Sequence, residues 1–173
     1  LSMNYYVDVM LPLPLKGTFT YQVTHDEFKK LEIGYRVAVS FGKRKIYTGI
    51  VQELHNKKPE SYETKSIEFI YDNNKLITQK QIDFWNWLSK YYFVPIGDIM
   101  KAAVPSTFLL ESDSLIIKKE ISDDDYGKLS DDEFLIYDAL GIQNLKLNDI
   151  SQIINKKNPY PIIQKMISSG YVE

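Results

Sequence analysis

Five short segments within the first 71 residues alternate apolar with polar side chains. They are residues 5–11, 18–23, 35–41, 46–54 and 66–71, as in "YYVDVML" and "YRVAVSF". A period of two residues is the pattern of a β-strand with one buried face. The segments recur about every ten residues, and the connection "FGKRK" is short and contains a glycine, which indicates a hairpin. The pattern therefore predicts a small antiparallel sheet or a partly closed barrel.

The first two segments are joined by "LPLPLKG", in which Pro12 and Pro14 alternate with leucine. Proline gives no hydrogen bond to a sheet and fixes its own φ, so it belongs at edges and in connections. We expect the two prolines to end an edge strand and to stiffen the path into a turn at residues 16–17. That turn leads directly to Phe19 and Thr20.

Helical signals follow the strands. Thr78 and Gln81 have capping-box spacing, which predicts a helix over residues 78–92. Its apolar stripe would consist of Ile82, Trp85, Leu88 and Tyr92. This spacing favours core packing for Trp85 and for the neighbours of Trp87 over an exposed platform for base stacking.

Pro95 suits the first position of a second helix, which Pro105 ends. The first domain is therefore predicted to span residues 1–108 as an α+β unit, a small antiparallel sheet or partly closed barrel with two helices.

Residues 109–173 have a different pattern. A short strand and an acidic loop are expected over residues 114–128, followed by helices at 130–140, 148–155 and 158–170 and the start of a strand at "YVE". Three closely spaced helices followed by a strand are the order of a winged-helix, or helix-turn-helix, domain. We expect such a domain here, with a wing that is either complete or truncated.

Charge is distributed unevenly over the 173 residues. Residues 1–110 contain 14 Lys and Arg against 11 Asp and Glu, and residues 111–173 contain 7 against 12. DNA contacts are therefore expected mainly in the first domain. The chain contains no cysteine, which excludes disulfides and thiolate zinc sites and fits the reducing cytoplasm. Its apolar runs are much shorter than the roughly 20 residues of a membrane-spanning helix, so no membrane contact is expected.

Catalytic patterns are missing from the sequence. The Gly-Lys pairs at 42–43 and 127–128 lack the other residues of a phosphate-binding P-loop, and His25 and His55 lie in polar, loop-like surroundings. The run "DDD" at 123–125 lacks the spacing of a calcium loop and indicates a solvated loop. We therefore expect no catalytic residue, no metal site and no cofactor in this chain.

Basic residues are better candidates for a binding site. Lys43, Arg44 and Lys45 share the predicted hairpin tip, where they would contact DNA phosphates or simply keep the tip soluble. In the second domain, candidate duplex contacts surround the start of the last helix, namely Lys156, Lys157, Tyr160, Gln164 and Lys165. A helix N-terminus with lysines suits duplex DNA, but an acidic winged helix equally suits a protein partner.

Three motifs in order, "VDVMLPLPLKGTFTYQV", "GYRVAVSFGKRKIYTGIV" and "YYFVPIGDIMKAAVPSTF", resemble the amino-terminal part of the family of primosomal protein N′, PriA, the replication-restart helicases. The resemblance covers residues 3 to 108. In that family the chain continues into an ATP- and Mg-dependent 3′–5′ helicase core and a zinc-binding region. The resemblance therefore implies a DNA-binding fragment of a longer, cytoplasmic protein that acts at forks.

The resemblance also implies a pocket for the 3′ end of the nascent leading strand at a stalled fork, so that the primosome can be reloaded. Its implied residues are Phe19, Thr20, Gly42 and Lys65. The family pattern has a carboxylate at the position of Thr20, and threonine supplies only a neutral acceptor. The implied partners are branched DNA with a 3′-OH end, other primosome proteins and single-strand-binding protein. The alternative is a scaffold that docks replication proteins and contacts DNA only incidentally.

Overall fold

The computed structural model describes residues 4–43, 45–71 and 74–173. The chain divides into two compact units, Leu1–Leu109 and Leu110–Glu173. Each is described by itself. Among the described residues, no helix combines the length and apolar character needed to cross a bilayer.

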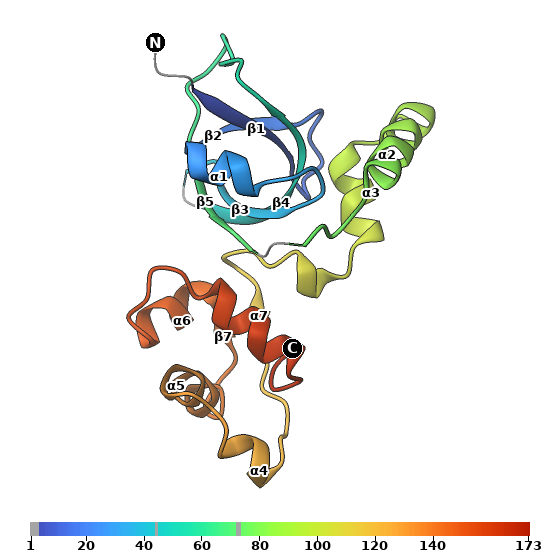
Figure 1. Ribbon diagram of the computed structural model, residues 1–173. Coiled ribbons are helices and arrows are strands. Elements are labelled where there is room, and N and C mark those ends of the chain that lie inside the picture. The colour runs from blue at the N-terminus through green and yellow to red at the C-terminus, as the bar shows by residue number, and fades with distance from the viewer. Residues whose placement is uncertain (1–3, 44, 72–73) are drawn as a thin grey trace. The chain divides into compact units, whose positions relative to one another are not determined.

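Five strands of the first unit form one antiparallel sheet that curves into a half-barrel (Figure 1). They are β1 (Tyr5–Met10), β2 (Phe19–Val23), β3 (Arg36–Phe41), β4 (Lys45–His55) and β5 (Ile67–Ile70), in the order β2-β1-β4-β3-β5. A parallel bridge between Gln22 and Ser66 brings the two ends of this order together. The predicted α+β fold with a partly closed barrel is confirmed.

Side chains on the two faces of the sheet belong to two separate apolar cores. Inward-facing residues such as Val7, Val39 and Val51 fill the barrel. Met10 and Ile50 face the other way and pack with residues of the helices that follow the barrel. The period of two in the sequence therefore reflects two apolar layers, because part of the outer face is also covered.

The proline segment leaves a central strand, not an edge strand as predicted. β1 lies between β2 and β4, and it ends at Met10, before the first proline. The backbone N–H of Leu13 donates to the carbonyl of Leu11, and that of Leu15 donates to Leu13, both at 2.8 Å. These are two successive three-residue turns centred on Pro12 and Pro14, whose fixed φ suits an inverse γ-turn.

A short helix, α1 (His25–Lys30), was not predicted from the sequence. Thr24 and Glu27 form a reciprocal capping box at its start, and this spacing was the missed signal. The ring of Tyr5 contacts His25 and Phe28, with ring centroids 5.0 and 4.8 Å apart, so the helix packs beside β1.

Helices α2 (Gln79–Tyr92) and α3 (Ile96–Ala103) lie beside the barrel and lead to a 3-10 turn, η1 (Ser106–Phe108). The predicted capping box of Thr78 and Gln81 is present, and Pro95 lies at the N-cap of α3 rather than at its first position. Both helices are thus confirmed, with one boundary shifted by a residue.

The apolar stripe predicted for α2 is only half correct. Ile82 and Trp85 are buried, but Tyr92 is 62% exposed. Phe84, Trp87 and Tyr91 form a second row, in which neighbouring rings stack with interplanar angles of 15° and 21°. The members of this row are 54%, 53% and 62% exposed, so core packing applies to Trp85 and not to the residues beside Trp87.

The second unit is mainly helical, as predicted. It contains β6 (Leu115–Ile116), α4 (Asp123–Tyr126), α5 (Asp131–Ala139), β7 (Leu145–Lys146), α6 (Leu147–Ile153) and α7 (Tyr160–Ser168). The acidic run expected as a loop is instead the first turn of α4, where Ser122 accepts from the N–H of Asp125. Carboxylates suit a helix N-terminus because of its partial positive charge.

Strand pairing in the second unit is short. β6 pairs antiparallel with β7. The end of the chain pairs with the residues that follow β6, since Ile117 and Glu173 exchange backbone hydrogen bonds of 2.8 and 2.9 Å. The strand start predicted at "YVE" is therefore an isolated bridge, Lys118 to Val172.

Candidate nucleic-acid interface

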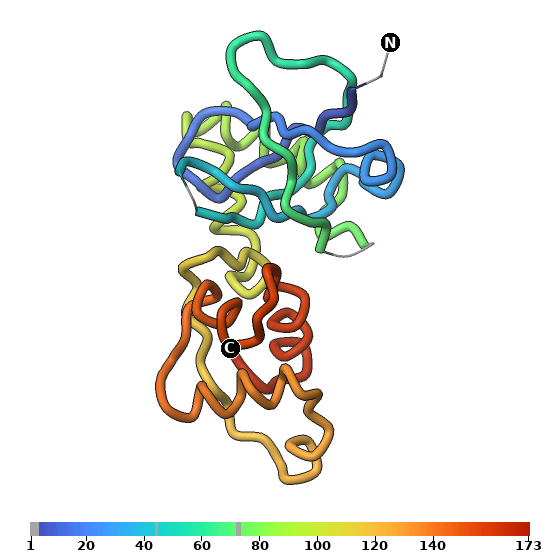
Figure 2. The backbone as a smooth tube through the Cα atoms, turned by 90° about the vertical axis from the view of Figure 1, so that its left-hand side faces the viewer, coloured from blue at the N-terminus to red at the C-terminus, as the bar shows by residue number. Residues whose placement is uncertain are grey.

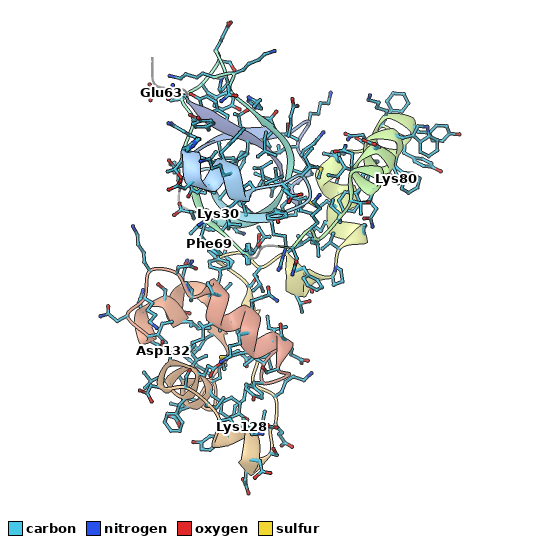
Figure 3. All side chains as sticks on the ribbon, viewed as in Figure 1. Lys30, Glu63, Phe69, Lys80, Lys128 and Asp132 are labelled. Carbon is cyan, nitrogen blue, oxygen red and sulfur yellow. The ribbon has the colours of Figure 1, made fainter. Side chains whose placement is uncertain are left out.

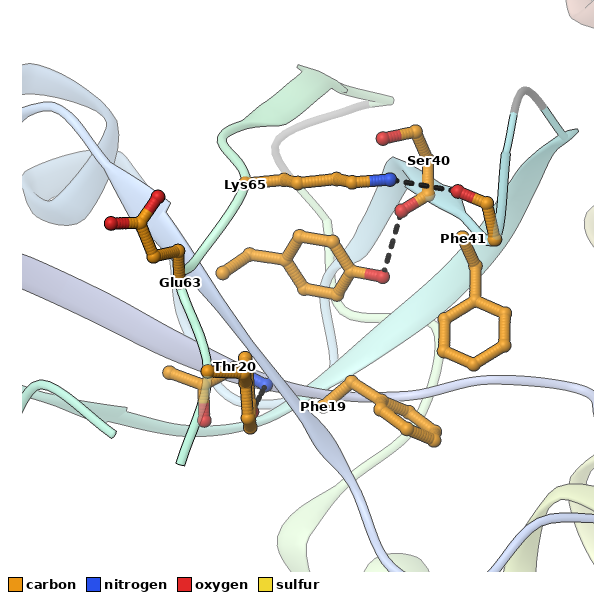
Figure 4. Close-up of a pocket in the computed structure, with 9 residues that line it drawn as sticks. Phe19, Thr20, Ser40, Phe41, Glu63 and Lys65 are labelled. Atoms are coloured by element: carbon orange, nitrogen blue, oxygen red, sulfur yellow. Dashed lines mark hydrogen bonds between the residues drawn. The ribbon is translucent and has the colours of Figure 1, made fainter. Parts of the chain in front are cut away.

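A pocket of about 300 Å³ opens in the first unit between β2, the end of β3 and the β4–β5 connection (Figure 4). That connection, coloured green, runs along the outside of the barrel (Figure 2). The pocket is lined by Phe19, Thr20, Tyr21, Ser40, Phe41, Gly42, Tyr62, Glu63 and Lys65. The structure thus brings together all four residues that the family resemblance implied for a pocket, Phe19, Thr20, Gly42 and Lys65. Their role in binding remains a prediction.

The hairpin between β3 and β4 supplies one wall of the pocket. Phe41 pairs with Lys45, and Gly42 follows with a φ of +68°, which side chains other than glycine rarely adopt. A Cβ at Gly42 would have open space around it, so the turn conformation and not crowding favours glycine. The ammonium of Lys65 donates to the Gly42 carbonyl at 2.9 Å and joins the β4–β5 connection to this hairpin.

Aromatic rings form the inner part of the pocket. Phe19 and Phe41 pack edge to face with centroids 4.6 Å apart, and both also contact the barrel core. The Tyr21 hydroxyl donates to the Ser40 carbonyl at 3.0 Å. Burial raises the pKa of Tyr21 well above its ordinary value, so this group stays a hydrogen-bond donor. The inner wall is therefore apolar and uncharged.

Thr20 contributes its backbone to the pocket in a way that the sequence did not indicate. Asp8 and Thr20 lie directly opposite each other in the β1–β2 register. The Thr20 hydroxyl donates to Asp8 Oδ1 at 2.6 Å, on the face opposite to Phe19 and Tyr21. Its backbone N–H donates to the Tyr62 hydroxyl at 3.0 Å. The hydroxyl expected to face a ligand is thus bound to a carboxylate on the outer face.

His55 completes this outer cluster. The backbone N–H of Lys57 donates to His55 Nδ1 at 3.2 Å, which leaves the proton of the neutral ring on Nε2. Nε2 in turn donates to Asp8 Oδ1 at 3.1 Å. Sequence reasoning placed His55 in a loop and did not single out Asp8, because the strand register that unites them cannot be read from spacing.

Two of the three predicted phosphate contacts, Lys43 and Lys45, lie on the β3–β4 hairpin, next to the pocket residue Gly42. Lys43 is exposed at the hairpin tip, and the Lys45 ammonium lies 5.2 Å from the centre of the Tyr47 ring. Arg44 lies outside the described residues. Within the described residues, no group of three or more His, Asp or Glu side chains is arranged to hold a metal ion.

The candidate duplex contacts of the second unit are differently placed. Lys156 pairs with Asp132, which Figure 3 labels on α5. Lys165 Nζ lies 2.8 Å from Glu133 Oε1. Lys157 is exposed and Gln164 is half-buried.

Tyr160 is only 3% exposed, so its ring cannot reach a duplex in this conformation, and we withdraw it from the candidate surface.

Glu133 itself is buried, with 2% of its surface exposed, and it is the third residue of the α5 capping box. Burial raises the pKa of Glu133, but hydrogen bonds from Lys165 and Ser130 lower it more, to a net value below the usual range. The same pairing raises the pKa of Lys165. These charges therefore link α7 to α5.

A small aromatic pocket lies where the two ends of the half-barrel meet, with Lys65 and Glu63 at its lining and Lys43 beside it. Such a pocket is typical of a nucleic-acid-binding domain, and comparison with known proteins makes this assignment specific. Residues 8–105 match the 3′ DNA-binding domain of PriA. The chain belongs to the PriA family of replication restart proteins.

Several relatives support the match. The replication restart protein PriA of Buchnera aphidicola subsp. Acyrthosiphon pisum (strain APS) is 30% identical over 116 residues, which are 66% of this chain and 15% of the relative. That of Rickettsia prowazekii (strain Madrid E) is 33% identical over 97 residues, 56% of this chain and 14% of the relative. That of Treponema pallidum (strain Nichols) is 24% identical over 105 residues, which are 58% of this chain and 16% of the relative. The chain thus spans about one seventh of the length of these relatives.

Proposed function

We propose that the pocket between β2, the β3–β4 hairpin and the β4–β5 connection binds the 3′-terminal nucleotide of a DNA strand. The observation that carries the proposal is the meeting of Phe19, Gly42 and Lys65 in one pocket of about 300 Å³. This volume is at the lower end of small-ligand sites, about 300–1,000 Å³, and suits one nucleotide. The aromatic wall offers a surface for the base, and the nearby lysines offer charge for phosphate.

In the cell, this end binding would recognise the nascent leading strand at a stalled or abandoned fork, so that the primosome and the replicative helicase are reloaded. The ATP- and Mg-dependent motor and the structural zinc would lie in the part of the longer relatives that this chain does not span. Other primosome proteins and single-strand-binding protein would be partners, in the cytoplasm.

A fluorescence anisotropy titration at fixed salt tests the pocket. A fork with a free 3′-OH should bind more tightly than the same fork with a 3′-phosphate. Phe19→Ala should weaken end binding by about tenfold, because a base–aromatic stack contributes about 1–3 kcal/mol, and should leave plain duplex binding nearly unchanged. Equal affinity of the parent chain for the two forks would overturn the proposal.

For the second unit we infer a winged-helix-type fold that docks a protein rather than a duplex. The helix order α5, α6, α7 supports the fold. So does the strand pairing, because residues 115–119 pair on one side with β7 and on the other side with the end of the chain. The pairing of Lys156 and Lys165 with acidic residues, and the excess of acidic residues over 111–173, favour a protein partner.

A further inference from the structure

The seam of the half-barrel is closed in two different ways. The backbone N–H of Gln22 donates to the Lys65 carbonyl at 2.8 Å, as in an ordinary sheet. Two residues earlier on the same edge of β2, the N–H of Thr20 donates to the side-chain hydroxyl of Tyr62 at 3.0 Å. A free strand edge presents such amides as ready donors. At Thr20 the acceptor is therefore a side chain, which can rotate away without breaking the backbone bridge.

Tyr62 differs from the other aromatic residues of the pocket. Phe19 and Phe41 pack against each other and the core, and Tyr21 is 4% exposed. Tyr62 is 44% exposed and belongs to the irregular β4–β5 connection. Tyr62 lines the pocket and is the most exposed of its aromatic residues, since Phe19 and Phe41 are half-buried.

The segment after Tyr62 is anchored on both sides of the pocket. The Lys65 carbonyl accepts from Gln22 of β2, and the Lys65 ammonium donates to Gly42 of the hairpin. Figure 4 shows the Lys65 side chain extended toward the hairpin. Because Lys65 holds the connection in place, movement of Tyr62 alone would open the pocket and leave its walls intact.

We propose that Tyr62 is a displaceable cover of the pocket and determines how the terminal nucleotide is held. The Tyr62 hydroxyl occupies the place of a ligand oxygen on the Thr20 N–H. A nucleotide that enters presents an oxygen of its base or sugar to this amide, and the Tyr62 ring turns to stack on the base. This inference rests on the proposed binding of 3′ ends and adds a residue to it.

Two variants separate the hydroxyl from the ring. Tyr62→Phe keeps the ring and removes the internal acceptor, so it should bind a fluorescent oligothymidine with a free 3′-OH as tightly as the parent chain or up to a few-fold more tightly. Tyr62→Ala removes the stack and should weaken binding about tenfold. Tyr126→Ala, at a tyrosine that is 43% exposed in the other unit, is the control and should leave the affinity unchanged.

The amide NMR signal of Thr20 provides a second measurement. It should shift in Tyr62→Phe without DNA, and in the parent chain when the oligothymidine is added. The inference is overturned if Tyr62→Ala binds like the parent, or if Tyr62→Phe weakens binding as much as Tyr62→Ala, since the hydroxyl would then be a fixed structural tie. If the parent chain prefers 3′-OH ends and Tyr62→Ala binds them as tightly as the parent does, only the role of Tyr62 as a cover is refuted. If the parent chain itself shows no preference for 3′-OH ends, the proposed binding of 3′ ends in the pocket is refuted.

Discussion

Gly97, at the second position of α3, has no room for a side chain. A Cβ there would lie 2.1 Å from the carbonyl oxygen of Leu13 and 2.3 Å from that of Leu11. Both carbonyls belong to the proline turns that connect β1 to β2. Glycine therefore allows α3 to pack directly on the segment that leads to Phe19.

Gly97→Ala should lower the free energy of unfolding of the first unit by about 1–3 kcal/mol, the usual cost of forcing atoms into a packed site. Urea denaturation followed by tryptophan fluorescence measures this change, because both tryptophans lie in α2. Gly127→Ala is the matched control, since a Cβ there would meet its nearest atom at 3.6 Å with an ordinary φ of −69°. A Gly97→Ala chain as stable as the parent would show that α3 can shift away.

At the scale of elements, the contact between α5 and α7 depends on a charge pair. Lys165→Ala would leave the buried carboxylate of Glu133 without its cation. We expect the melting temperature of the second unit to fall by about 4 °C at neutral pH. Lys157→Ala, at an exposed lysine in the connection before α7, should have little effect.

The pH dependence of this pair has a definite sign. The folded-state pKa of Glu133 is lowered from an ordinary value of 4.5, so its contribution is present above that pH and is lost as the pH falls through the folded-state pKa. The difference in melting temperature between the parent and Lys165→Ala should therefore shrink below about pH 4.5. A difference that stays constant down to pH 3 would contradict a role for Glu133 ionisation.

The elements also show what a sequence can and cannot indicate. The five strands were predicted because a period of two survives even where both faces are partly covered. The orientation of α2 was not predicted in full, because the helix carries two apolar rows at the same helical spacing. One row contains Ile82 and Trp85, and the other contains Phe84 and Trp87. Only the tertiary contacts decide which row is buried. The outer position of the Thr20 hydroxyl likewise depends on its register with Asp8, which is a long-range pairing.

At the scale of the whole molecule, the two units differ in charge as well as in fold. The excess of basic residues lies in residues 1–110, and two lysines of the second unit are paired internally. We expect a chain cut after Leu109 to keep its own core and to bind 3′ ends with nearly the parent's salt dependence. The slope of log K against log salt should change by less than about one, because each phosphate contact contributes about 0.7–0.9.

The salt titration also separates the two candidate roles of the second unit. A slope that becomes shallower by two or more after removal of residues 110–173 would mean that this unit contacts phosphates, and the protein-docking proposal would fail. An unchanged slope, together with a separate thermal transition for each unit, would support DNA binding by the first unit and protein docking by the second.

The pairing of Asp8 with Thr20 has a consequence for how related sequences are compared. The resemblance to the family implies a carboxylate at the position of Thr20, and in this chain a carboxylate, that of Asp8, lies directly across the ladder from Thr20. Cβ atoms of such partners lie only about 4.5–5.5 Å apart, so an acidic group on either strand occupies nearly the same volume. Selection would therefore act on the pair, and substitutions at the two positions should co-vary. An alignment inspected one column at a time would record only the missing acid at position 20 and would overlook the carboxylate of Asp8 on the neighbouring strand.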